Sequence, residues 1–111
     1  MERYTLQANR THKAYTIEAC GRKISVDYDD IFFFETSVNI HKIILHASDR
    51  QIEFSGTMKE LAGTLDGNFV RCHRSFLVNK NNIKEVDAKN RILYFPNGES
   101  CLMSTRMMKE L

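Results

Sequence analysis

The chain has 111 residues, of which 42% are hydrophobic and 27% are charged, and its formal net charge is +2. This length predicts one domain with a real hydrophobic core, and the composition is typical of an ordinary globular protein. A membrane span needs about 18 consecutive apolar residues, and no run comes near that length. The polar N-terminus lacks the apolar segment of a secretory signal, so we expect a cytoplasmic protein without membrane contact.

The order of the predicted elements favours a mainly β fold. Residues 1–12 have no strong periodicity and are expected to be a tail or a linker remnant, ahead of one domain over residues 13–111. Short alternating segments separated by turn signals follow and predict strands. In chain order, these segments are residues 14–19, 23–28, 29–37, 41–47, 50–56, 69–73, 76–78, 83–87, 91–95 and 99–103.

Helical signals are few. Asp29 and Asp30 are suited to start one helical turn before the aromatic run Phe32–Phe34. Residues 57–65 place apolar side chains on one helical stripe, and residues 104–111 are expected to form a short capped helix. The fold class is therefore mainly β, with antiparallel sheets and short flanking helices.

The adjacent residues Cys72 and His73 raise the question of nucleophilic or metal chemistry. On a regular strand, neighbouring side chains point to opposite faces, so the pair is not expected to form a nucleophile–base dyad. Alternation places Cys72 on the apolar face with Val70. The three cysteines form no C-x-x-C pair, and His41 and His46 lack the spacing of metal ligands. No catalytic residue, metal or cofactor is predicted.

Basic residues gather in two acid-free stretches, residues 67–84 and residues 100–109. A local basic surface on a near-neutral domain is able to attract a polyanion. Charge alone leaves three interpretations open: loops that bind nucleic acid, loops that are simply solvated, and a β-type protein-interaction module that does not bind DNA.

The segment NFVRCHRSFLVNKNNIKEVD, residues 68–87, resembles the LytTR DNA-binding domains, which form the output half of many bacterial response regulators. The segments YDDIFFFETS and RQIEFSGTMKEL and residues 91–111 extend the resemblance over residues 13–111. It implies elongated antiparallel β-sheets with short flanking helices, and loops that bind direct repeats of double-stranded promoter DNA in the major groove. It also implies a two-component regulator of quorum-sensing or virulence genes, with a receiver domain and RNA polymerase as partners of the full-length protein.

The resemblance implies three base-contacting residues, His41, Arg74 and Arg106, and all three side chains offer donors to base edges. Members of the quorum-sensing branch carry Asn at the Arg74 position. Since Asn favours adenine and Arg favours guanine, a different base is expected there. Phosphate contacts are expected from surrounding polar side chains. They are Lys42, Arg50, His73, Ser75 and Lys80.

Two cysteines also match positions of that branch. The resemblance implies that Cys72 and Cys101 are redox-sensitive thiols that form an intramolecular disulfide under oxidation. Cys72 lies close to Arg74 in sequence, and Cys101 precedes Arg106. A disulfide is therefore expected to displace two base-contacting residues together.

Overall fold

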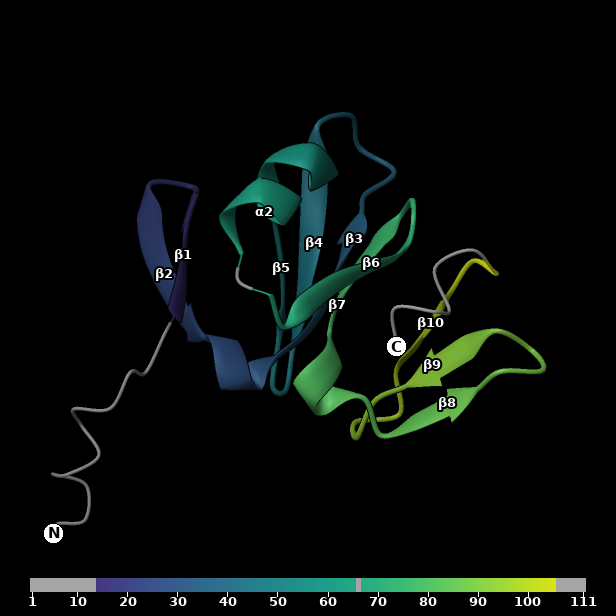
Figure 1. Ribbon diagram of the computed structural model, residues 1–111. Helices are drawn as coiled ribbons and strands as arrows, with labels where there is room; N and C mark the ends of the chain where they lie inside the picture. Colours follow the sequence, from purple (N-terminus) through teal and green to yellow (C-terminus); the bar gives the residue numbers. More distant parts are fainter. Residues whose placement is uncertain (1–13, 66, 106–111) are drawn as a thin grey trace, which may run out of the picture.

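The computed structural model describes residues 14–65 and 67–105 (Figure 1). These residues form short strands, two 3-10 turns and one α-helix, which confirms the predicted mainly β, antiparallel fold. The elements in chain order are β1 (Ala14–Ala19), β2 (Arg22–Asp27), η1 (Tyr28–Asp30), β3 (Ile31–Thr36), β4 (Lys42–Ala47), β5 (Gln51–Ser55), α2 (Met58–Thr64), β6 (Phe69–His73), β7 (Phe76–Asn79), η2 (Lys80–Asn82), β8 (Glu85–Asp87), β9 (Ile92–Tyr94) and β10 (Ser100–Leu102).

The strands form three antiparallel sheets. The central sheet has the order β5-β4-β3-β7-β6, the N-terminal hairpin pairs β1 with β2, and the C-terminal sheet has the order β10-β9-β8. In Figure 1 the hairpin and the C-terminal sheet lie on opposite sides of the central sheet. The central sheet therefore has two faces to cover, and both carry apolar side chains.

The middle strand β3 is buried on both faces. Its first four residues, Ile31–Phe34, are all buried, because a core covers each face of the strand. A bulge between Ile31 and Phe33 interrupts the alternation of the strand against β4. Phe34 joins Ile31 in a first core, whereas Phe32 and Phe33 belong to a second core. One strand thus connects both layers of the domain.

The first core lies under the N-terminal hairpin and α2. Ile17 and Val26 enter it from the hairpin, and Met58 and Leu61 enter it from the helix. The helix begins at Met58, one residue after the predicted start, because Thr57 is its N-cap and its hydroxyl accepts a hydrogen bond from the Glu60 amide at 3.3 Å. This layer supports the central sheet from the side opposite the C-terminal sheet.

The second core joins the central sheet to the C-terminal sheet. Its buried members are Phe32, Phe33, Cys72, Val78, Leu93, Phe95, Cys101 and Met103. Phe32 stacks on Phe95 with ring centroids 5.6 Å apart. The two predicted thiols, Cys72 and Cys101, therefore belong to one apolar layer.

Several predicted boundaries moved by one or two residues. The strand expected over residues 83–87 begins at Glu85, because the preceding residues Lys80–Asn82 form η2, in which the Asn81 amide donates to the side chain of Asn79. Most of the helix expected over residues 104–111, and the proposed boundary between residues 12 and 13, lie outside the described residues. Within the described part, no helix is long and apolar enough to cross a membrane.

Candidate nucleic-acid interface

Two loops lie together at one end of the central sheet. The β3–β4 loop comprises residues 37–41, and the β6–β7 turn comprises Arg74 and Ser75. Strands β3 and β7 are antiparallel neighbours, with Glu35 opposite Phe76. The Thr36 amide then donates to the Ser75 carbonyl at 3.1 Å, which ties the two loops to each other. Figure 1 shows both at the upper end of the sheet, and we call them together the loop end.

The β3–β4 loop has a defined shape. The Ser37 amide donates to the Lys42 carbonyl at 3.0 Å and closes the loop. The Asn39 side chain donates to Glu53 at 2.8 Å and anchors the loop to β5. His41 has a φ of 58°, a left-handed conformation that a residue other than glycine seldom adopts unless its surroundings hold it there. Its exposed imidazole is therefore presented from a constrained backbone position.

The β6–β7 turn is held from within. Arg71 donates from Nη2 to the Arg74 carbonyl at 2.8 Å, so Arg71 supports the turn, while the Arg74 side chain is exposed. The Ser75 amide donates to Nδ1 of His73 at 3.1 Å. Because Nδ1 accepts, the neutral His73 ring carries its proton on Nε2 and has a donor at that position.

The prediction that the side chains of Cys72 and His73 point to opposite faces of the strand is wrong. A bulge between Arg71 and His73 makes His73 pair with Phe76, and the two side-chain rings pack with their centroids 5.6 Å apart. The Phe76 ring in turn packs on the second core, which also contains Cys72. His73 therefore does not occupy the opposite face. The two side chains still have separate hydrogen-bond partners, since the Cys72 thiol donates to the Leu102 carbonyl at 3.3 Å.

The phosphate-contact candidates divide between two ends of the sheet. Lys42, at the start of β4, directly follows His41, and it is exposed, while His73 and Ser75 belong to or flank the β6–β7 turn. Arg50 lies in the β4–β5 turn and Lys80 begins η2, both at the opposite end of the sheet. A six-residue strand such as β4 spans about 20 Å. The structure therefore brings three of the candidates together and separates the other two.

The third predicted base-contacting residue, Arg106, lies outside the described residues. The last described segment approaches β6, because the Ser104 amide donates to the Cys72 carbonyl at 2.7 Å. The chain thus comes alongside β6 near the β6–β7 turn before the described part ends.

The two candidate thiols meet inside the second core. The Sγ atoms of Cys72 and Cys101 are 4.0 Å apart, and both residues are free cysteines. Sulfur atoms in a disulfide are about 2.05 Å apart, so bonding needs a modest local movement. The hydrogen bond with Cys72, together with burial, raises the pKa of the Cys101 thiol well above its usual value. Thiolate, the reactive form, is therefore scarce while the core is closed.

A histidine cluster that the sequence did not reveal joins the two sheets. His46 is buried and stacks on Phe33, with ring centroids 4.2 Å apart. Its Nδ1 lies 3.0 Å from Oε2 of Glu99, and its Nε2 meets Oε1 of Glu35. Gln51 also donates to Glu99, at 2.9 Å. With a carboxylate oxygen facing each ring nitrogen, His46 links β3 and β4 to the segment before β10.

The environment of Glu99 favours its charged form. Partial burial raises the pKa of this carboxyl group, but hydrogen bonds from Asn97, His46 and Gln51 and the charge of His46 lower it. The lowering influences prevail, and the pKa of Glu99 lies below its usual value. No local sequence pattern signals this cluster, since Glu99 is 53 residues from His46 and Glu35 is 11 residues from it.

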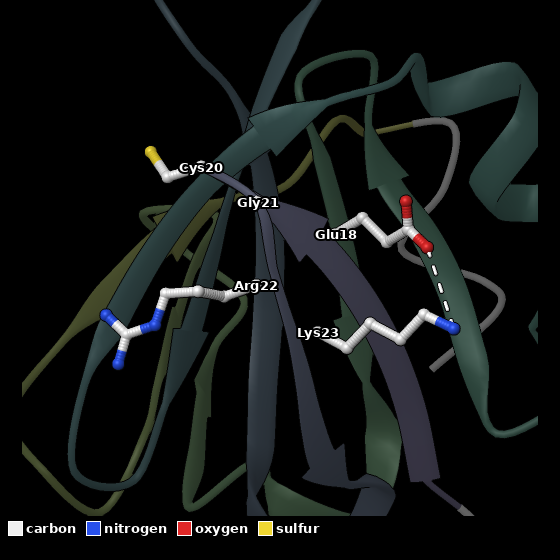
Figure 2. A pocket seen from close by; sticks show the side chains of 5 residues that line it. All are labelled: Glu18, Cys20, Gly21, Arg22 and Lys23. Carbon is white, nitrogen blue, oxygen red and sulfur yellow. Dashed lines mark ion pairs between the residues drawn. The ribbon is translucent and has the colours of Figure 1, made fainter.

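A shallow hollow occurs at the tip of the N-terminal hairpin, away from the loop end (Figures 1 and 2). Figure 2 shows Glu18 and Lys23 on one side, as an ion pair of 3.9 Å, and Cys20 and Arg22 on the other. Cys20 and Gly21 both have positive φ, as the two central residues of a type I′ turn do. No three His, Cys, Asp or Glu side chains gather as a metal site within the described ranges.

Comparison with known proteins places these features in a family. Residues 21–111 match the LytTr DNA-binding domain. Relatives named accessory gene regulator protein A, from Staphylococcus epidermidis and Staphylococcus aureus, are 52% and 51% identical over 91 residues. These matches cover 82% of this chain but only 38% of each relative.

A solved structure supports the same grouping. It is described as the LytTr DNA-binding domain of a response regulator from Bacillus cereus, and it is similar to this chain with a TM-score of 0.75 and 25% sequence identity. The similarity covers 87% of this chain and 91% of that one. The family resemblance expected from residues 68–87 is thereby confirmed.

Proposed function

Since this chain belongs to the LytTr DNA-binding domain family, we propose that it binds promoter DNA sequence-specifically by placing its loop end in the major groove, and that it thereby regulates transcription. The observation that carries this proposal is the loop end itself. His41 and Arg74 are exposed on two constrained loops that the Thr36–Ser75 hydrogen bond joins. Rigid presentation of donors at a fixed separation is what base recognition requires.

We propose distinct roles for the base-contacting residues. Arg74 suits bidentate donation to O6 and N7 of guanine, and His41 donates to or accepts from a base edge through its imidazole. Arg106 is proposed as the third contact because the family resemblance points to it and because the preceding segment runs beside β6. Three separate loops then read neighbouring bases without a recognition helix.

The phosphate contacts are proposed in two groups. Lys42, His73 and Ser75 lie at the loop end and are proposed to hold the phosphates that flank the bases read there. Arg50 and Lys80 lie at the other end of the sheet, so they are proposed to contact phosphates further along the duplex. Phosphate contacts set the register of the protein on DNA but do not carry sequence information directly.

The context of the whole protein is proposed from its relatives, of which this chain spans 38%. We propose that the domain acts in a cytoplasmic two-component response regulator, together with a receiver domain and RNA polymerase. Direct repeats in promoters are the proposed sites, since two linked copies of one domain would each bind one repeat. The name accessory gene regulator protein A, carried by the staphylococcal relatives, supports quorum-sensing or virulence genes as the targets.

A redox response is proposed for the same domain. Under oxidation, Cys72 and Cys101 form a disulfide: each thiol loses its proton and one electron to peroxide, which is reduced to water. The bond would pull β6 and β10 together in the second core, and the Ser104–Cys72 hydrogen bond and the β6–β7 turn lie directly beside it. Oxidation is therefore expected to disturb the loop end and to weaken DNA binding.

Salt-titrated DNA binding tests the proposed function. The wild-type chain should select a preferred duplex from a random pool, and its affinity should fall steeply as salt rises. His41→Ala and Arg74→Ala should each cost about 1–3 kcal/mol on that duplex and relax one base position, with little change on random DNA. Failure to bind any duplex at low salt would contradict the proposal and would favour the alternative, a β-type protein-interaction module.

A further inference from the structure

Two aliphatic side chains at the loop end are turned to solvent. Val38 is 100% exposed and Ile40 is 82% exposed, and both lie in the β3–β4 loop directly before His41. The other large hydrophobic side chains that are exposed in the described residues, Val86 and Leu102, are about half covered and lie in strands of the C-terminal sheet. Such complete exposure of two neighbouring aliphatic side chains, in the loop proposed to enter DNA, indicates a binding partner with apolar surface.

The loop conformation enforces this exposure. Ser37 and Asn39 alternate with the two aliphatic residues, and both donate side-chain hydrogen bonds to Glu53, at 3.2 Å and 2.8 Å. The Asn39 amide also donates to the Ser37 hydroxyl at 3.0 Å. The polar side chains thus anchor the loop to β5, while Val38 and Ile40 remain outside. This is the reverse of the usual arrangement, in which apolar residues of a loop turn inward.

The neighbouring charges narrow the choice of partner. Lys42 is exposed two residues after Ile40, and Arg74 is exposed on the turn that the Thr36–Ser75 hydrogen bond attaches to this loop. Cationic side chains around an aliphatic tip fit an anionic surface that carries small apolar groups. The major groove of DNA has this character, because the C5-methyl group of thymine lies among base edges and between two phosphate backbones.

We propose that Val38 and Ile40 contact thymine methyl groups beside the base that His41 reads, and that they make the binding site thymine-rich at those positions. This inference rests on the proposed DNA-binding function and adds residues to it. His41 supplies a hydrogen bond to one base edge, and the aliphatic pair recognises the apolar edge of the adjacent pairs. Such contacts distinguish thymine from cytosine at the same pyrimidine position, since cytosine lacks the methyl group.

Replacing single thymines with deoxyuridine tests the proposal, because this change removes only the methyl group. The probe is the duplex that the wild-type chain selects from a random pool, with each thymine replaced in turn, and the readout is the dissociation constant at fixed salt. The wild-type chain should lose affinity about fourfold at one or two positions, the change expected for one buried methyl group. Val38→Ala and Ile40→Ala should bind the unmodified duplex more weakly than the wild type. At the position that each side chain contacts, the variant should bind the thymine duplex and the deoxyuridine duplex equally well.

Matched controls separate this proposal from the function on which it rests. Both side chains are exposed, so their removal leaves the cores intact; Val86→Ala, which removes an exposed valine of β8, should keep the full thymine preference. A wild-type chain that binds its selected duplex but tolerates uridine at every position would overturn only this inference. If both loop variants kept the thymine preference, the proposed thymine contacts would also be overturned. A protein partner would then be the remaining candidate to contact Val38 and Ile40. A wild-type chain that selects no duplex would overturn the proposed function as well.

Discussion

The amide of Thr36 donates to the carbonyl of Ser75 at 3.1 Å, at the point where the β3–β4 loop and the β6–β7 turn leave the central sheet. The two residues are far apart in sequence, yet this bond fixes the spacing of the loops that carry His41 and Arg74. Antiparallel pairing of β3 with β7 produces the contact, since Glu35 lies opposite Phe76 one step earlier. The proposed base-contacting groups are therefore positioned by strand register rather than by a helix.

The division of the phosphate contacts predicts a dependence on duplex length. Lys42→Ala should reduce the slope of log affinity against log salt by about 0.9, because one phosphate contact is lost. Arg50→Ala and Lys80→Ala should reduce the slope on a long duplex but not on a short one that spans only the bases read by the loop end. Slopes measured on both duplexes check this division. An unchanged slope for Lys42→Ala on both would contradict it.

The positions of the three thiols predict their order of reaction. Cys20 is exposed, whereas Cys72 and Cys101 are buried and burial helps to raise the pKa of the Cys101 thiol. An alkylating reagent should therefore modify Cys20 first, and the other two only after unfolding. Mass mapping of the native and denatured protein checks this order.

Peroxide treatment of a Cys20→Asn chain should slowly yield a Cys72–Cys101 disulfide and weaken DNA binding. Cys101→Ala in the same background is the matched control, because it keeps Cys72 but has no partner for it. It should retain its affinity after oxidation. Equal loss of affinity in both chains, or a peptide map without the crosslink, would rule out the proposed redox response.

The histidine cluster predicts a pH-dependent contribution of Glu99 to stability. Because its folded-state pKa is lowered, this contribution is complete above the ordinary value of 4.5 and is lost as pH falls through the lowered folded value. At pH 7, Glu99→Gln should reduce the free energy of unfolding by about 1–2 kcal/mol, an amount already discounted for partial exposure. Urea unfolding at several pH values measures this difference.

The difference between Glu99→Gln and the wild type should shrink as the pH falls below the ordinary value of 4.5 and through the lowered folded value. Glu85→Gln, an exposed change in β8, is the control and should have little effect at any pH. A difference that instead grows as the pH falls would show that the Glu99 carboxylate is not stabilised by this cluster.

The hairpin turn offers a stabilising substitution. Cys20 has a φ of 53° and precedes Gly21, whose φ is 73°. Asn tolerates the left-handed conformation better than Cys and is preferred in the Asn-Gly type I′ turn. Cys20→Asn should therefore raise the free energy of unfolding by about 1 kcal/mol, whereas Cys20→Ser should give no gain. Thermal unfolding compares the two, and equal stability of both variants would contradict the backbone explanation.

Sequence periodicity predicted most of the fold, because these strands are short and separated by clear turn residues. It failed at the bulge in β6. Alternation predicts that Cys72 and His73 lie on opposite faces, and one extra residue in the strand changes this outcome. Bulges depend on pairing with a partner strand, so single-strand patterns do not reveal them.

The candidate site was only partly accessible from the sequence. The loops that carry His41 and Arg74 could be named from their residues and from the family resemblance, but their common location depends on the pairing of β3 with β7. The cluster of His46 and Glu99 was missed because its members are distant in the chain. The exposure of the two aliphatic residues of the β3–β4 loop, Val38 and Ile40, was not predicted from the sequence.

The most direct test of the account is selection of binding sites from random duplexes by the wild type and by Arg74→Asn. Arg prefers guanine and Asn prefers adenine, so the account predicts that one guanine in the wild-type site becomes adenine in the variant's site while the other positions stay the same. Arg74 is exposed, so its replacement by Asn should leave the fold intact. Identical selected sites for both proteins would contradict base reading by Arg74 and, with it, the proposed role of the loop end.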